Sequence, residues 1–147
     1  MPDSGQALRV AALRLLTRRD YGRAELKAKL TTDAGSEEQL NSVLDALHAE
    51  GLLSDRRYAS ERVAARAVRY GNVRLKQELR QHGISDDDIA AALPEGGDEV
   101  ARCRAVWARK FGRLPVDATE RARQMRFLQY RGFSGEAIRG AMRGADE

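Results

Sequence analysis

Three serines recur along this chain at a fixed interval of 49 residues. An aliphatic residue follows each serine by four positions, and a leucine precedes it by six. The matched sets are Ser36, Ser85 and Ser134; Leu40, Ile89 and Ile138; and Leu30, Leu79 and Leu128. A fixed period of this size is typical of stacked supersecondary units. Because a unit this short buries too little apolar surface alone, neighbouring units must pack on one another.

The serines stand where helices should begin. In Ser36-Glu37-Glu38-Gln39 and Ser85-Asp86-Asp87-Asp88, a hydroxyl acceptor is followed three residues later by an amide or a carboxylate. Such a pair can cap the free N–H groups of a first helical turn, and the acidic residues oppose its positive end. Gly83 and Gly132 precede their serines, where a left-handed glycine can end the previous helix. The same role is expected of Gly51, Gly71 and Gly112.

The third copy departs from the register at two places. Leu26 and Leu75 share one position of the register, but Gln124 stands there in the third copy. Tyr21-Gly22 recurs as Tyr70-Gly71 and has no third counterpart. The first two helices of the last unit should therefore be joined differently.

Apolar residues at helical spacing predict nine helices and no strand. The expected ranges are 6–19, 22–31 and 36–50; 55–70, 72–82 and 85–93; and 98–111, 117–131 and 134–143. The predicted fold class is all-α, as three tandem three-helix repeats over residues 1–53, 54–97 and 98–147. Stacked end to end, these repeats would form an elongated array that can be curved.

The sequence contains no arrangement of side chains that is typical of catalysis. His48 and His82 fall in different repeats, and glycine-rich phosphate loops, serine-nucleophile turns and zinc-binding helix motifs are missing. Cys103, the only cysteine, lies on an apolar helix face and is interpreted as an inert buried thiol. Capping explains the acidic run at Asp86–Asp88 better than metal binding does. We predict no enzyme, no metal and no cofactor.

No apolar run approaches the roughly 20 residues that are needed to cross a bilayer. Residues 1–5 also lack the basic start and apolar core of a signal peptide. The sequence therefore predicts a cytoplasmic protein.

Positive charge is concentrated in the second and third repeats. Residues 56–83 hold eight basic and two acidic residues, a balance of +6, and residues 102–131 reach +7. On the expected helix 55–70, a rotation of about 100° per residue places four arginines beside the apolar stripe. Such a face favours a polyanion or an acidic protein groove, although a solvated helix surface would also be charged. We predict partner contacts at Arg57, Arg62, Arg66, Arg69, Arg74, Lys76, Arg126 and Arg131.

The alternative prediction is a DNA-binding module of the helix-turn-helix type. The segment Glu25-Leu26-Lys27, followed by residues 40–53, looks like the trihelical part of a winged helix. That class requires a β-hairpin after Leu53, whereas residues 55–70 have a strongly helical pattern. The helix that would read DNA also carries four carboxylates and no Lys or Arg, and phosphate would repel it.

Several short motifs, in this order and spacing, resemble the RecX family over about residues 7–143. The central match is Leu53–Ala59 with Arg66, Arg69, Gly71, Arg74, Glu78-Leu79 and Gly83-Ile84. The C-terminal match is Arg126–Ser134 with Ile138. The first repeat matches more loosely, through Ala12, Leu15, Leu16, Arg19, Glu25, Leu26, Lys29 and Leu30. The resemblance implies three tandem three-helix repeats, in agreement with the period of the serines.

The same resemblance implies a partner. Members of the family bind the RecA recombinase filament on single-stranded DNA, and they usually restrain its extension, ATP hydrolysis, strand exchange and coprotease role. From this resemblance we expect a monomeric, non-enzymatic regulator in DNA recombination, DNA repair and the SOS response. Weak direct binding to DNA is left open.

Overall fold

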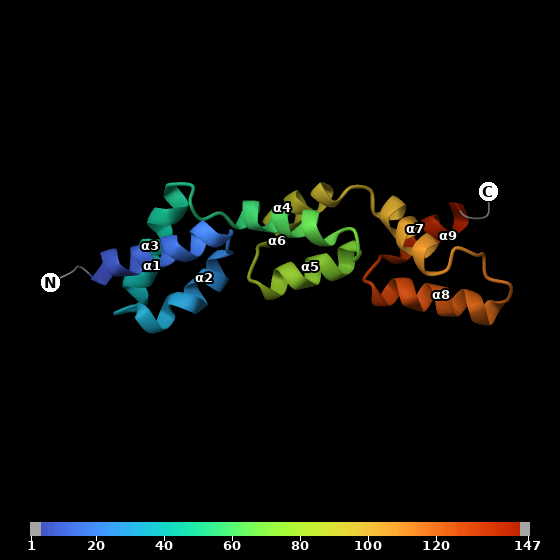
Figure 1. Ribbon diagram of the computed structural model, residues 1–147, viewed down its shortest axis with the longest axis horizontal. Coiled ribbons are helices and arrows are strands. Elements are labelled where there is room, and N and C mark those ends of the chain that lie inside the picture. The colour runs from blue at the N-terminus through green and yellow to red at the C-terminus, as the bar shows by residue number, and fades with distance from the viewer. Residues whose placement is uncertain (1–3, 145–147) are drawn as a thin grey trace.

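The computed structural model describes residues 4–144, and every regular element in that range is helical. Figure 1 shows three bundles in a row with the chain ends far apart, so the molecule is elongated. The first repeat holds α1 (Ser4–Arg18), α2 (Arg23–Leu30), η1 (Thr31–Asp33) and α3 (Glu37–Ala49). The second holds α4 (Asp55–Arg66), α5 (Asn72–Gln81), α6 (Asp86–Ala92) and η2 (Leu93–Gly96). The third holds α7 (Glu99–Lys110), α8 (Ala118–Tyr130) and α9 (Gly135–Gly144). The predicted all-α tandem array is confirmed.

Each bundle has its own core, and the aliphatic residues of the 49-residue register lie inside it. They are at most 2% exposed in every repeat: Leu30, Leu79 and Leu128, and Leu40, Ile89 and Ile138. Full burial of a leucine or isoleucine side chain contributes about 1.5–3 kcal/mol. The register therefore marks positions that stabilise each bundle.

Gln124, which interrupts the register, is 1% exposed and is satisfied by hydrogen bonds. Its Oε1 accepts from the indole Nε1 of Trp107 at 2.8 Å, and its Nε2 donates to the carbonyl of Arg113 at 3.1 Å. A buried indole N–H needs an acceptor. The third core contains a tryptophan, so an amide takes the place of the leucine that the other repeats use.

The predicted serine caps are confirmed in all three repeats. The hydroxyls of Ser36, Ser85 and Ser134 each accept a hydrogen bond from the backbone N–H three residues later, at 3.1 to 3.2 Å. Such a cap typically contributes about 1 kcal/mol. Gly83 and Gly132 have φ angles of 79° and 88°, so both end their helices in the left-handed conformation as expected.

The prediction that Gly71 ends a helix in the same way is wrong. Its backbone is extended, with φ −85° and ψ 172°, and it is the N-cap of α5. Close approach of the next repeat is what requires glycine, since a Cβ there would lie 2.3 Å from Cα of Phe133 and 2.4 Å from its backbone N. At Gly22, one repeat earlier, a Cβ would meet only side-chain atoms, the nearest on Ile84 at 3.3 Å.

The repeats are joined through the N-termini of α2 and α5, the second helices of the first two repeats. At the junction of the second and third repeats, the N–H of Gly71 donates to the carbonyl of Arg131 at 2.9 Å. The N–H of Asn72 donates to the carboxylate of Glu99 at 2.8 Å. The first N–H groups of a helix have no partner inside the helix. Here the following repeat supplies the acceptors.

The first junction uses the same arrangement. The N–H of Arg23, at the start of α2, donates to Oδ1 of Asp55 at 2.7 Å. Asp55 and Glu99 are both the first residue of the first helix of their repeats. In the third repeat Asp117 caps α8 with its own side chain, accepting from the N–H of Glu120 at 2.8 Å. This explains why the third copy of the sequence has no Tyr-Gly pair.

Helix α4 ends at Arg66, four residues earlier than the predicted end at residue 70. A turn follows, and the carbonyls of residues 67–70 accept hydrogen bonds from arginines of the third repeat. Arg102 donates to the carbonyls of Ala67 and Tyr70, at 2.9 and 3.1 Å. Arg109 donates to the carbonyl of Val68 at 3.3 Å, and Arg131 donates to that of Arg69 at 3.4 Å. Contacts with the next repeat therefore decide where this helix stops.

Candidate partner-binding surface

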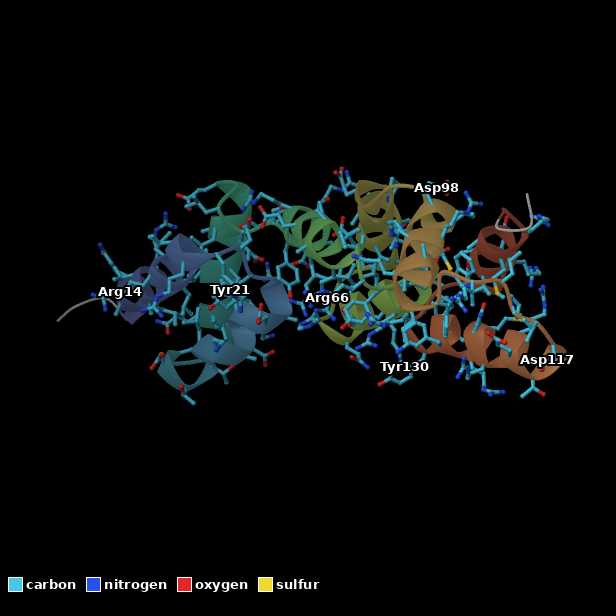
Figure 2. All side chains as sticks on the ribbon, turned by 45° about the vertical axis from the view of Figure 1, so that its right-hand side comes forward. Arg14, Tyr21, Arg66, Asp98, Asp117 and Tyr130 are labelled. Atoms are coloured by element: carbon cyan, nitrogen blue, oxygen red, sulfur yellow. The ribbon has the colours of Figure 1, made fainter. Side chains whose placement is uncertain are left out.

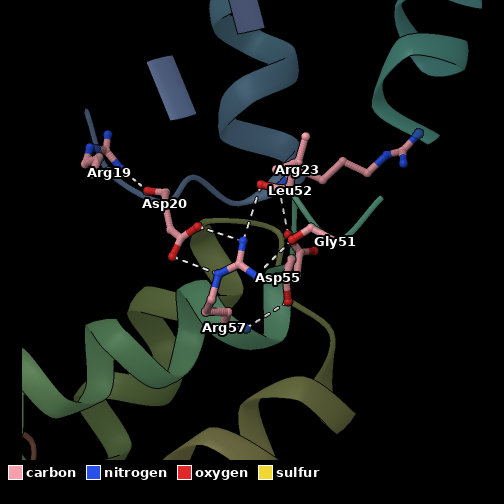
Figure 3. Close-up of polar contacts among 8 residues, drawn as sticks. Arg19, Asp20, Arg23, Gly51, Leu52, Asp55 and Arg57 are labelled. Carbon is pink, nitrogen blue, oxygen red and sulfur yellow. Dashed lines mark hydrogen bonds and ion pairs between the residues drawn. The ribbon is translucent and has the colours of Figure 1, made fainter. Parts of the chain in front are cut away.

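Arg57, the first of the predicted contact residues, is bound to the first repeat. Its guanidinium makes a two-point ion pair with Asp20, with Nε–Oδ2 and Nη2–Oδ1 distances of 2.9 Å. It also donates to the carbonyls of Gly51 and Leu52, as Figure 3 shows. The hydrogen bonds from Arg57 hold the pKa of Asp20 below its usual value. Arg57 thus ties the first two repeats together, and its contact with a partner stays a prediction.

Arg66 is engaged within the second repeat. Its guanidinium pairs with Glu78 at 2.7 and 2.8 Å and lies over the ring of Tyr70 at 4.6 Å. Burial raises the pKa of Glu78, but hydrogen bonds from Arg66 and Arg74 outweigh it and hold that pKa below its usual value. Reversing the charge at Arg66 would place two carboxylates side by side. A charge-reversal variant at Arg66 would therefore lose stability as well as any partner contact, so weaker binding by that variant would not identify Arg66 as a contact residue.

Arg62 is half-buried, and its Nε has no hydrogen-bond partner among the described residues. Hydrogen bonds from Arg19 are the main cause that lowers the pKa of Glu25 in the first repeat, and the positive charge of Arg62 lowers that pKa further. The four arginines that were expected to share one face of helix 55–70, namely Arg57, Arg62, Arg66 and Arg69, therefore do not form one surface. Arg57 and Arg62 lie toward the first junction, and Arg69 lies toward the second.

An open groove of about 620 Å³ lies where the second and third repeats meet. Its walls come from the turn after α4, from α5, and from α7 and α8. Five cations line it, and no Asp or Glu does so within the part of the chain that the structure describes: Arg69, Arg74, Arg109, Lys110 and Arg131. Three of the five were predicted contact residues. The local field favours a ligand with several negative charges.

Aromatic rings lie among these cations. The ring of Tyr70 faces the guanidinium of Arg74 at 4.1 Å, and the ring of Phe127 faces that of Arg131 at 5.2 Å. Such pairs are attractive and hold the cations in place at the surface. Tyr130 differs, because it is 78% exposed. Figure 2 places it at the lower edge of the molecule, beside the second and third repeats.

The remaining predicted residues, Lys76 on α5 and Arg126 on α8, are exposed and lie outside the lining of the groove. The sequence did not predict Arg109, Lys110 or the rings of Tyr70, Phe127 and Tyr130 as contact residues. A signal for them was present, since each of two helices repeats the spacing i, i+3, i+4 that places side chains on one face. The two sets are Val106, Arg109 and Lys110, and Phe127, Tyr130 and Arg131.

Within residues 4–144, no three His, Cys, Asp or Glu side chains lie close enough together to hold a metal ion. No helix in that range has the length and apolar character to cross a membrane. Cys103 is fully buried, and burial raises the pKa of its thiol to about 12, so the thiol stays protonated at neutral pH.

Comparison with known proteins gives consistent matches along the chain. Residues 54–93 match the family model described as the second three-helix domain of RecX, and residues 97–142 match its third three-helix domain. "Regulatory protein RecX" of Chromobacterium violaceum is 44% identical over 144 residues, which cover 98% of this chain and 94% of that protein. The protein of the same name from Ectopseudomonas mendocina is 47% identical over the full length of both chains.

A solved structure supports the fold independently. The crystal structure of RecX from Lactobacillus salivarius superposes with a TM-score of 0.88 over 99% of both chains, at 22% identity. At that identity the likeness concerns the fold alone. The full-length relatives and the two matching family models show that this chain belongs to the RecX family.

Proposed function

We propose that this protein is a non-enzymatic regulator that binds the RecA recombinase filament on single-stranded DNA and restrains its ATPase, strand-exchange and coprotease activities. Membership of a family whose relatives are named regulatory proteins supports this proposal. The observation that carries it is the groove between the second and third repeats, which is lined by five cations and three aromatic rings and to which the described residues contribute no carboxylate. Such a surface suits a partner that is rich in phosphate.

The shape of the chain suggests how restraint would work without chemistry. Three bundles in a row, joined by hydrogen bonds at both junctions, can reach across neighbouring subunits of a filament. Each repeat needs only a small contact, because linked contacts raise the effective concentration of one another. A protein held along the filament would exclude the next subunit or an exchanging strand from the same groove.

The alternative function, a helix-turn-helix module that acts directly on DNA, finds less support. Such a module needs a wing after its third helix, and α4 follows α3 after only a short connection. Helix α3 also carries acidic residues in its first turn. Phosphate would be repelled from the end of the helix that would have to enter the DNA groove.

A comparison of binding to assembled filament with binding to bare single-stranded DNA should distinguish the filament regulator from the DNA-binding module. We expect wild-type protein to bind RecA on single-stranded DNA at least about tenfold more tightly than the bare strand, because several repeats engage at once. The difference should grow as salt is raised, since binding through phosphate alone weakens with a log–log slope of about −0.7 per contact. Co-sedimentation across a salt series would measure both affinities. Equal affinity for filament and bare strand at every salt concentration would favour the alternative function.

A further inference from the structure

We infer that the groove between the second and third repeats is a binding site for single-stranded nucleic acid, with a base stacked on Tyr130 and phosphates on the cations beside it. This inference rests on the proposed function in assigning that strand to the filament, and it names the component of the filament that this surface contacts. The binding step itself is a property of the protein alone. It can be tested on a bare strand without recombinase.

The charge of the groove is available to a ligand. The side chains of Arg69 and Lys110 make no hydrogen bond or ion pair with the described residues. Lys110 is exposed, and its Nζ lies 5.1 Å from the centre of the Phe127 ring. Glu78, the nearest acidic side chain on α5, is already paired with Arg66 and Arg74. This pairing offsets part of the charge of Arg74, so the field in the groove comes mainly from Arg69, Arg109, Lys110 and Arg131. Phosphates that bind there can release their counterions.

Two further cations are held in fixed positions. Arg109 donates one N–H to the carbonyl of Val68 at 3.3 Å, and Arg131 donates one to the carbonyl of Arg69 at 3.4 Å. A guanidinium has five N–H donors in a planar fork, so each retains donors for a phosphate. Because the anchoring carbonyls belong to the second repeat and the arginines to the third, a bound strand would contact both repeats.

Tyr130 distinguishes a nucleic acid from a purely anionic ligand. The faces of Tyr70 and Phe127 are already covered by cations, at 4.1 to 5.2 Å. Within residues 4–144 no ring or cation covers Tyr130, and it is 78% exposed. Exposed rings beside a positively charged groove are how proteins stack the bases of single strands. An acidic peptide would use the cations but has no need of the open ring.

A second, smaller groove extends the site past this ring. It has a volume of about 370 Å³ and shares Arg74 and Tyr130 with the first groove. Its lining includes three amide side chains that can hydrogen-bond base edges: Gln77, Gln81 and Gln129. The carboxylate of Glu78 also lines this groove, where it is paired with Arg66 and Arg74. A strand could therefore run from the basic groove over Tyr130, with its bases toward the amides of the second groove. In duplex DNA the bases are stacked on one another, so the ring could not reach a base face.

The ring is tested with Tyr130→Ala and Tyr130→Phe, using fluorescence anisotropy of a labelled single-stranded oligothymidylate. Because stacking on an aromatic side chain is worth about 1–3 kcal/mol per base, Tyr130→Ala should weaken binding about 5- to 150-fold. Tyr130→Phe keeps the ring face and should bind like the wild type. Equal binding by Tyr130→Ala and Tyr130→Phe would overturn the stacking role.

The cations are tested with the double variant Arg69→Glu/Lys110→Glu. Its matched control is Arg14→Glu/Lys29→Glu in the first repeat, which makes the same charge change at two exposed residues without hydrogen-bond or ion-pair partners among the described side chains. The groove variant should lose affinity, and its log–log salt slope should be shallower by about 0.7 for each lost phosphate contact. The control should keep the wild-type slope. Matching slopes in the two double variants would place the nucleic-acid contacts outside the groove.

Three competitors identify the ligand class. The near-ultraviolet dichroism of Trp107 confirms that each variant is folded. Unlabelled single strand should displace the probe, whereas the duplex of the same sequence and polyglutamate should do so only weakly. If polyglutamate displaced the probe at the same concentration as unlabelled single strand, the inference would be overturned in favour of an acidic protein partner. A wild type that binds bare strand through the groove but not the filament would contradict the proposed function while leaving this site standing.

Discussion

The Gly71→Ala variant is expected to lose about 3 kcal/mol of unfolding free energy, because a single added methyl group has no room at the second junction. A Cβ at residue 71 would lie 2.3 Å from Cα of Phe133 and 2.5 Å from the carbonyl carbon of Gly132. Both are backbone atoms, so no side-chain rotation relieves the overlap. Opening the junction would break the hydrogen bond from Gly71 to the carbonyl of Arg131. Urea unfolding followed by far-ultraviolet dichroism measures the change.

Gly22→Ala is the matched control for this variant. Gly22 has the same extended N-cap conformation in the first repeat, but the nearest atoms to its Cβ would be side-chain carbons of Ile84 and Tyr58 at 3.3 and 3.4 Å. These side chains can shift slightly, so we expect Gly22→Ala to stay within about 1 kcal/mol of the wild type. If Gly71→Ala were as mild as Gly22→Ala, close backbone approach would not be what requires glycine at residue 71.

Removal of the Arg102 side chain should cost a similar amount, about 3 kcal/mol, through unsatisfied carbonyls rather than overlap. Its guanidinium donates to the carbonyls of Ala67, Gly97 and Tyr70, at 2.9 to 3.1 Å. It also donates to Oδ1 of Asn72 at 2.9 Å. Burial lowers the pKa of Arg102, although the guanidinium stays charged at neutral pH. In Arg102→Ala, several half-buried acceptors at the second junction would lose their donor together.

Arg104→Ala, two residues along the same helix, controls for loss of an arginine from α7. The side chain of Arg104 is exposed and makes one hydrogen bond, to the carbonyl of Gly140 at 3.2 Å. Its removal should change the unfolding free energy by about 0.5 kcal/mol or less. Trp107 fluorescence would report the third repeat, and an Arg102→Ala variant no less stable than Arg104→Ala would mean that the carbonyls are satisfied in another way.

The repeat architecture could be predicted from the sequence because its signals are local. Ser36, Ser85 and Ser134 cap helices through a bond that spans three residues, and the leucines at constant offsets mark the buried face. The break at Gln124 could be seen but not explained. Its reason is a hydrogen bond to Trp107, 17 residues away, which no periodicity contains.

The junctions could not be predicted, because they depend on residues far apart in the chain. The tyrosine-glycine pairs were visible in the sequence, but Gly71 was assigned to a left-handed turn. Its neighbours at residues 132 and 133 belong to the next repeat. Likewise Arg57 looked like a surface residue until its contact with Asp20, 37 residues earlier, was known.

The candidate site was predicted in part for the same reason. The charge balance indicated the second and third repeats, and Arg69, Arg74 and Arg131 do line the groove there. A helical projection of residues 55–70 assumed one unbroken helix, whereas α4 ends at Arg66. The projection therefore grouped arginines that serve two different junctions. It also could not include α7 and α8, which supply Arg109, Lys110 and Tyr130.

The ATPase rate of the cognate RecA recombinase on single-stranded DNA, measured while this protein is added, tests the proposed function most directly. We predict that the rate falls as the wild type is added. Arg69→Glu/Lys110→Glu should require a higher concentration for the same fall, and Arg14→Glu/Lys29→Glu, which leaves the groove intact, should shift that concentration much less. An ATPase rate that stays constant while co-sedimentation shows the filament saturated with protein would contradict the proposed function.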